Sequence, residues 1–204
     1  CGGQAPHSPM EAGYAKWVGM AQQVDLNARL CDWENLWLAY QEASRGKRGR
    51  PAAAGFELYL ADHLLALQRE LEERTYRPGT YHSFYIHEPK KRLISAAPFR
   101  DRVVHHALCQ VTVPYFERLF DRDSYANRAR KGTHKALDRC QQLARRYRYV
   151  LPCDVVQFFP AIDHALVMEA IGRVVVDPDV LALIGTSASL MISDIPWDGP
   201  VAAI

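Results

Sequence analysis

The chain has 204 residues, which is enough for one sizeable domain or two small ones. Hydrophobic residues make up 49% of it and charged residues 24%, as in an ordinary globular protein, and the net charge is only +2. No apolar run approaches the roughly 20 residues that a membrane helix needs, so we expect a cytoplasmic protein without a membrane partner. The five cysteines are scattered, with no Cys-x-x-Cys pair, which argues against a zinc site and favours reduced thiols.

The beginning of the chain is expected to be irregular. Residues 1–25 contain Gly and Pro without a sustained period and predict a loose leader. Beyond it, Trp33, Trp37 and Tyr40 fall at helical spacing and predict a short amphipathic helix. This helix should end in a basic, glycine-punctuated loop over residues 45–50.

A helix and a hairpin are expected next. Apolar residues from Phe56 to Leu71 recur with a period near 3.6 and predict one continuous helix. The stretch TYHSFYIHEPKKRLISAAPF then predicts two strands joined by a basic turn, whose tip carries Lys90, Lys91 and Arg92.

Two more helices are expected in the middle of the chain. Asp101 is placed to cap a helix with an apolar stripe from Val104 to Tyr115, and Pro114 should kink or interrupt it. Thr133 is placed to cap the other helix. The residues expected on its inward face are Leu137, Cys140, Ala144 and Tyr147.

An aspartate follows a run of strand-forming residues. Residues 149–156 predict a buried strand that carries Asp154 at its end. A carboxylate buried there alone would cost several kcal/mol, so it would need a partner, most economically a divalent cation. The alternative is a strand-end aspartate that caps the next turn. Asp163 is placed to cap the following helix, and Asp177 before Pro178 is typical of another helix start.

Positive charge is concentrated in one segment. Between residues 128 and 148 the chain has eight Lys or Arg and a single acidic residue, Asp138. One hypothesis is a surface that follows phosphates, with Tyr125 and Tyr147 available to stack on bases; the alternative is a solvated helix face. The basic loop and hairpin tip favour a polyanionic partner. The candidate nucleic-acid contacts are Lys47, Arg48, Arg128, Arg130, Lys131, Lys135 and Arg145.

Three sequence blocks carry a family resemblance. They are EPKKRLISAAPFRDRVVHHAL (88–108), SYANRARKGTHKAL (124–137) and DVVQFFPAIDHALV (154–167). In this order they resemble two conserved blocks of the fingers and the first block of the palm in bacterial reverse transcriptases of the group II intron, retron and diversity-generating retroelement kind. The resemblance covers about residues 30–175.

The resemblance implies a fold and a division into domains. The expected fold is α+β and helix-rich, with reverse-transcriptase fingers and a partial palm that stops before the second block of catalytic carboxylates. The expected division is a leader over 1–25, fingers over 26–148 and a partial palm over 149–204.

The resemblance also implies an activity and its residues. The activity is RNA-directed DNA polymerisation, in which dNTPs are added to a primer on a template RNA with two Mg²⁺ ions. By resemblance, Asp154 is the catalytic aspartate that binds both ions, and Val155 lends a backbone carbonyl. Phe159 matches the aromatic gate that excludes a ribose 2′-hydroxyl. The residues matching the fingertip over the incoming triphosphate are Lys90, Lys91 and Arg92.

The sequence departs from the family after these blocks. The Tyr-x-Asp-Asp turn and the thumb are missing, so we expect an amino-terminal portion of a polymerase with little or no activity alone. One alternative is a non-catalytic module, derived from a reverse transcriptase, that only binds structured RNA. Another is a helical DNA-binding protein with a chance Asp-x-x-x-Phe-Phe motif. Besides template RNA, primer and dNTPs, the resemblance allows a retroelement accessory protein as a partner.

Overall fold

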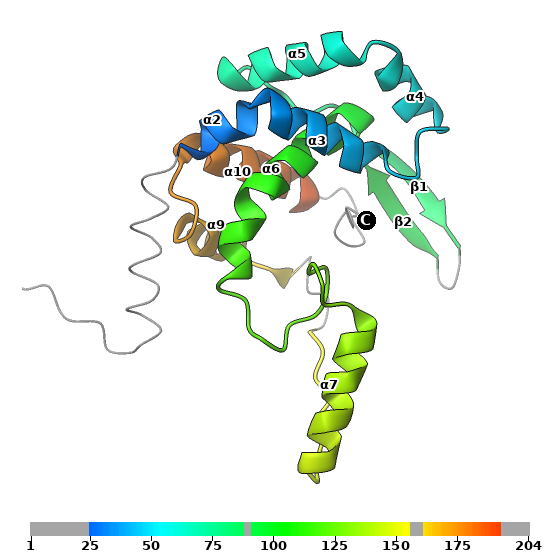
Figure 1. Ribbon diagram of the computed structural model, residues 1–204, viewed down its shortest axis with the longest axis vertical. Coiled ribbons are helices and arrows are strands. Elements are labelled where there is room, and N and C mark those ends of the chain that lie inside the picture. The colour runs from blue at the N-terminus through cyan, green and yellow to red at the C-terminus, as the bar shows by residue number, and fades with distance from the viewer. Residues whose placement is uncertain (1–24, 88–90, 156–160, 193–204) are drawn as a thin grey trace, which may run out of the picture.

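The structure is a computed structural model that describes residues 25–87, 91–155 and 161–192 (Figure 1). In these ranges it is a helix-rich α+β protein with one two-stranded sheet. The helices are α2 (Leu26–Cys31), α3 (Trp33–Ser44), α4 (Pro51–Leu58), α5 (Leu60–Glu72), α6 (Phe99–Glu117), α7 (Thr133–Arg146), α9 (His164–Gly172) and α10 (Pro178–Ile192). The strands are β1 (His82–Ile86) and β2 (Arg92–Ala96). None of the helices in the described ranges is long and apolar enough to cross a membrane.

The hydrophobic core lies among α2 to α6. The helix α3 packs along α6. The rings of Tyr40, Phe56 and Phe99 form a cluster in which the Tyr40 centroid lies 6.1 Å from that of Phe56 and 6.4 Å from that of Phe99, and the two phenylalanine centroids lie 5.2 Å apart. Val175 and Val180, from the far end of the chain, are fully buried in the same core. The segment predicted as a partial palm therefore contributes to the core of the segment predicted as fingers.

Aspartates begin several of the helices, as the sequence predicts for two of them. Asp163 caps α9 by accepting hydrogen bonds from the amides of Ala165 (2.8 Å) and Leu166 (3.2 Å). Asp177 accepts from the amide of Asp179 at 3.0 Å at the start of α10, and also from the amide of Asn27 at 2.9 Å. One carboxylate thus satisfies the first turns of both α2 and α10 and ties the two ends of the described chain together.

The predicted hairpin is confirmed, but the helix over residues 56–71 is divided into two. The strands pair antiparallel from His82 opposite Ala96 to Ile86 opposite Arg92. The helix breaks at Tyr59, whose φ of −123° and ψ of 44° end α4. His63 Nδ1 lies 3.0 Å from the carbonyl oxygen of Phe56, which the break releases. The apolar stripe stays on one side across the break, so its period did not reveal it.

One expectation for α6 is wrong, and of the kink or interruption expected at Pro114 the interruption does not occur. The helix begins at Phe99, so Asp101 lies in its first turn and does not cap it. Asp101 is 1% exposed and accepts hydrogen bonds from the Tyr76 hydroxyl and the Gly79 amide, both at 2.8 Å. This contact holds residues 76–79 against the start of α6. Pro114 does not interrupt the helix, which continues to Glu117.

Residues 133–155 differ most from the predictions. Gly132, not Thr133, occupies the N-cap position of α7, and the face predicted to be inward is solvent-exposed, with Leu137 56% exposed and no residue of α7 buried. Figure 1 shows this helix projecting away from the body of the molecule. Tyr149 and Leu151 are 86% and 84% exposed, and residues 149–155 form no strand. A strand needs a hydrogen-bonding neighbour, and the described residues provide none here.

We predict that Asp101→Ala destabilises the protein by about 3 kcal/mol, because it leaves the Tyr76 hydroxyl and the Gly79 amide without their acceptor in a buried site. Tyr76→Phe removes one donor and leaves the carboxylate its bond to Gly79, so it should cost about 1 kcal/mol. Denaturant unfolding measures both values. Equal stability of Asp101→Ala and the wild type would show that the contact has no structural role.

Candidate nucleic-acid interface

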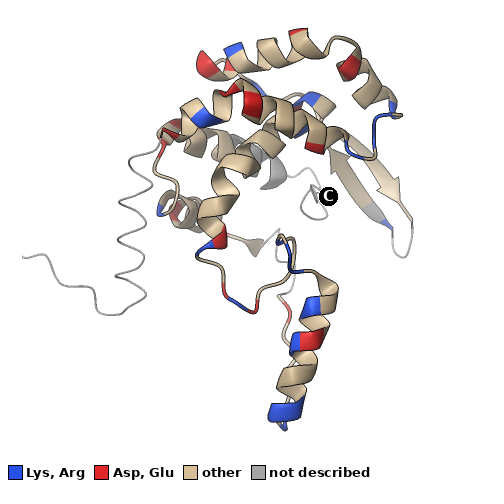
Figure 2. Ribbon diagram, viewed as in Figure 1, with Lys and Arg blue, Asp and Glu red and all other residues tan. Residues whose placement is uncertain are grey.

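Most of the candidate basic residues lie in a segment that projects from the core. We call residues 118–148, comprising a loop and α7, the basic arm. In Figure 2, lysines and arginines recur along α7 and gather at its distal end, where the last turn contains Arg145 and Arg146. The body of the molecule shows a mixture of both charges in the same view. The local excess of positive charge is therefore displayed on an element that packs little against the rest of the protein.

Arg128 joins the arm to the body. Its side chain is only 9% exposed, and its Nε and Nη2 atoms donate to the carboxylate of Glu117, at the end of α6, over 2.9–3.2 Å. Its Nη1 atom donates to the carbonyl oxygens of Asp121 (2.7 Å) and Ser124 (3.1 Å). The guanidinium lies over the ring of Phe120. Arg128 thus has a structural role, and its predicted contact with nucleic acid stays a prediction.

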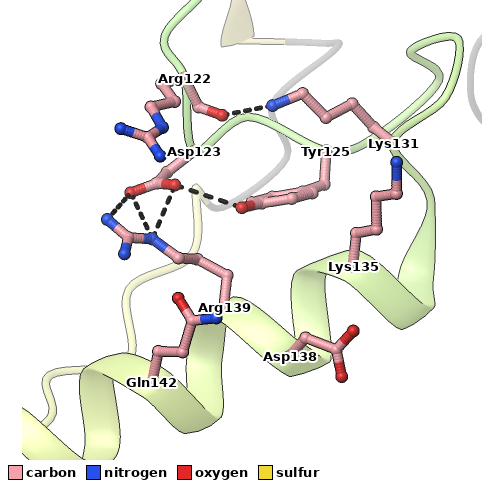
Figure 3. Close-up of a pocket in the computed structure, with 8 residues that line it drawn as sticks. All are labelled: Arg122, Asp123, Tyr125, Lys131, Lys135, Asp138, Arg139 and Gln142. Atoms are coloured by element: carbon pink, nitrogen blue, oxygen red, sulfur yellow. Dashed lines mark hydrogen bonds and ion pairs between the residues drawn. The ribbon is translucent and has the colours of Figure 1, made fainter.

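A second bidentate ion pair fastens α7 to the loop. Arg139 Nε lies 2.9 and 3.1 Å from the two carboxylate oxygens of Asp123, and Nη2 lies 2.9 Å from Oδ2 (Figure 3). The Tyr125 hydroxyl donates to the same carboxylate at 3.2 Å. The hydrogen bond from Arg139 holds the pKa of Asp123 below its ordinary value of 3.8. A lowered carboxyl pKa means that the pair is fully formed above pH 3.8 and is lost only as the pH falls through the lower value.

The loop and α7 enclose a hollow of about 250 Å³ (Figure 3). Lys131 contributes from the loop: its Nζ donates to the carbonyl of Arg122 and lies 4.8 Å from the centre of the Tyr125 ring. Lys135, on α7, donates to the carbonyl of Arg130 at 2.6 Å. The residues that line the hollow are Arg122, Asp123, Tyr125, Lys131, Lys135, Asp138, Arg139 and Gln142.

Several of these residues escaped the sequence predictions. The lining includes Arg122, Asp123, Arg139 and Gln142, which are not among the predicted contacts. On α7, polar residues at positions 135, 138, 139 and 142 recur every three or four residues, so they share the side of the helix that faces the loop. That spacing was the available signal. The apolar residues of α7 hide this signal, because an amphipathic helix normally turns its apolar side inward.

The remaining basic candidates are dispersed. The loop over residues 45–50 is confirmed as a turn region, lies apart from the arm in Figure 2, and contains Lys47 and Arg48; Arg48 Nε is 3.9 Å from Glu57. Lys91 stands over the ring of Tyr85 at 4.6 Å, beside Arg92 at the start of β2. Arg130 and Arg145 are exposed on the arm. Lys90 lies outside the described residues.

The surroundings of Asp154 do not match the expected buried site. Asp154 is exposed, and its Oδ1 accepts a hydrogen bond from the amide of the next residue, Val155, at 2.9 Å. Within residues 25–87, 91–155 and 161–192, no three His, Cys, Asp or Glu side chains are grouped as a metal site. Among the described residues Asp154 is thus a single candidate ligand, whereas a pair of magnesium ions needs several carboxylate oxygens. Phe159 lies outside the described residues.

Comparison with known proteins gives partial matches. No family model matches the chain. It is 32% identical over 96 residues (47% of the chain) to nuclear intron maturase 1, mitochondrial, and 26% identical over 167 residues (73%) to nuclear intron maturase 2, mitochondrial, both from Arabidopsis thaliana. A stretch of 28 residues (14%) is 64% identical to polyribonucleotide nucleotidyltransferase of Syntrophotalea carbinolica. The chain spans 13%, 23% and 4% of the lengths of these three relatives, respectively.

We predict that Arg128→Ala loosens the arm without unfolding the body. Loss of this nearly buried guanidinium leaves the Glu117 carboxylate and two carbonyls without their donor. Amide hydrogen exchange over residues 121–131 should accelerate by about 10-fold or more, which corresponds to about 1.4 kcal/mol, while α3 and α6 keep their protection.

Arg145→Ala is the matched control, since it removes one positive charge from the arm at a residue without a described partner. It should leave exchange in the loop unchanged. Uniform acceleration across the arm and the core in Arg128→Ala would contradict a local clamp.

Proposed function

We propose that this chain is an RNA-binding protein and that the basic arm is its main contact with the phosphate backbone. The observation that carries the proposal is the state of α7. An amphipathic helix normally buries its apolar side, but α7 buries none of its residues and is held in place by ion pairs and hydrogen bonds. Its last turn leads directly into Tyr147 and Arg148, so its tip is both positive and aromatic.

The available cations on the arm suit a phosphate chain. In the described part of the structure, the guanidinium groups of Arg130, Arg145 and Arg148 have no hydrogen-bond or ion-pair partner. Binding a phosphate would therefore break no internal contact at these residues. Each such contact releases condensed counterions, which favours binding at low salt. Tyr147 is 54% exposed and offers a ring face for stacking on a base.

Similarity to intron maturases favours RNA over other polyanions. Introns are RNA segments after transcription, and the match to nuclear intron maturase 2 covers 73% of this chain. The alternative of a helical DNA-binding protein explains the positive charge equally well, but it does not explain the likeness to maturases. RNA binding is thus the function best supported by the arm and the comparisons together.

A finer proposal concerns the complete protein. We propose that it is a bacterial retroelement reverse transcriptase with a fingers-and-palm fold, which takes template RNA, a primer and dNTPs and uses Asp154 with Mg²⁺. The three blocks at residues 88–108, 124–137 and 154–167 support this, as does the similarity to maturases. The described residues supply a single exposed carboxylate, so any metal centre needs further ligands. A non-catalytic RNA-binding module remains the alternative.

The RNA-binding proposal predicts an effect that depends on position. Arg145→Ala together with Arg146→Ala should weaken binding of a structured RNA. The slope of log affinity against log salt should fall by about 1.4–1.8, since about 0.7 is lost per phosphate contact in a single strand and about 0.9 in a duplex. Fluorescence anisotropy over a salt series measures both quantities.

Arg29→Ala together with Arg69→Ala is the control, because it removes the same charge from exposed positions of α2 and α5. It should leave the slope near the wild-type value. Equal losses in the two double variants would mean that net charge, not the arm, determines binding.

The polymerase proposal predicts that Asp154→Asn in the full-length protein lowers primer extension on an RNA template by at least 100-fold, as expected for a lost metal ligand. Asp163→Asn is the control, because asparagine caps a helix as well as aspartate and should preserve the rate. Extension by Asp154→Asn at a tenth of the wild-type rate or more would show that this residue is not a metal ligand. RNA binding by a full-length wild type that extends no primer would favour the non-catalytic module.

A further inference from the structure

The hollow between the loop and α7 has the composition of a small polar binding site. The ring of Tyr125 faces it from the loop, and Lys135, Asp138, Arg139 and Gln142 project from one side of α7 (Figure 3). Its volume of about 250 Å³ is below the roughly 300–1,000 Å³ of pockets that hold drug-sized ligands. The size therefore suits one unit of a longer ligand, such as a sugar with its phosphate, better than a whole cofactor.

The charged groups of the hollow are not equally available. Arg139 is committed to Asp123. Lys131 and Lys135 each donate to one backbone carbonyl, and an ammonium group has three donors, so both retain donors for a ligand. Among the described residues, the carboxylate of Asp138 and the amide of Gln142 have no hydrogen-bond partner. The hollow is thus lined by two lysines that keep free donors, Lys131 on the loop and Lys135 on α7, and by the carboxylate of Asp138 on α7 (Figure 3).

This pairing restricts the ligand. Lysines favour a phosphate, but a free carboxylate beside a phosphate is repulsive unless the ligand also brings a hydrogen-bond donor. In RNA, each phosphate is adjacent to a ribose whose 2′-hydroxyl is such a donor, and DNA lacks it. A ribonucleotide would therefore satisfy both kinds of group, whereas a deoxyribonucleotide would leave the carboxylate unpaired next to the backbone.

We propose that this hollow binds a ribose–phosphate unit of RNA and that Asp138 accepts a hydrogen bond from its 2′-hydroxyl. The proposal rests on the RNA-binding function of the arm and assigns it a means of distinguishing RNA from DNA. Lys131 and Lys135 hold the phosphate, and Gln142 is placed to contact the same unit from the next turn of α7. The discrimination comes from a residue that weakens binding to DNA as well as strengthening binding to RNA.

The test compares oligouridylate with oligodeoxyuridylate of equal length, because the two differ only at the 2′ position. Fluorescence anisotropy at one salt concentration should show the wild-type chain binding the ribo-oligomer about 10-fold more tightly, the size expected for a hydrogen bond to a charged acceptor. Asp138→Ala should raise affinity for the deoxy-oligomer, since a repulsive charge is removed, and should not raise affinity for the ribo-oligomer, which also loses its hydrogen bond; the ratio should fall to about 2-fold or less.

Asp138→Asn is the matched control, because it removes the same charge but keeps an oxygen acceptor; it should retain a larger ratio than Asp138→Ala. Equal binding of both oligomers by the wild type would overturn the proposal for Asp138 while leaving RNA binding by the arm intact. So would an unchanged ratio in Asp138→Ala. Failure of the wild type to bind either oligomer would overturn this proposal, and failure to bind the structured RNA as well would overturn the proposed function.

Discussion

The ion pair between Glu117 and Arg128 determines where the chain leaves its core. Glu117 is the last residue of α6, which packs along α3, and Arg128 lies in the loop that leads to α7. Because α7 buries no residue, hydrophobic packing does not fix its position, and this nearly buried guanidinium attaches the loop before α7 to the end of α6. The bidentate pair between Asp123 and Arg139 then fixes the helix to the loop. Two ion pairs in series therefore connect α7 to the body.

Substitutions in an arm that is held together by ion pairs have two kinds of effect, on the shape of the arm and on its binding. Removal of Arg128 or Arg139 would disturb the shape of the arm, whereas removal of Arg145 or Arg148 would affect only what the arm can bind. Surface ion pairs contribute little each, but a bidentate pair with most donors satisfied is stronger. Loss of binding in a variant is therefore informative only when the exchange or unfolding of the same variant is also known.

The sequence predicted those elements whose signal is local. The hairpin and the helix starts at Asp163 and Asp177 depend on neighbouring residues, and all three are confirmed. The role of Asp101 could not be predicted, because its partners lie more than 20 residues away and its position three residues into a helix resembled a cap. The break at Tyr59 left no trace in the apolar period. Buried contacts with a distant segment decided the role of Asp101.

The distinction between local signals and contacts with distant residues also explains which features of the candidate site could be predicted. The basic excess of residues 128–148 is evident from composition, but only the three-dimensional contacts distinguish the structural Arg128 from the available Arg145. The strand expected over residues 149–156 needs a neighbouring strand that the described residues do not include. Residues 149–155 are therefore exposed, and Asp154 has no buried environment. Strand-forming composition alone did not determine the state of this segment.

The central claim, that the basic arm is the surface that contacts RNA, is tested most directly by amide hydrogen exchange of the chain with and without a structured RNA. The account predicts slower exchange over residues 121–148, with little change in α4, α5 and the buried part of α3. Protection confined to the body, with the arm unchanged at saturating RNA, would contradict it.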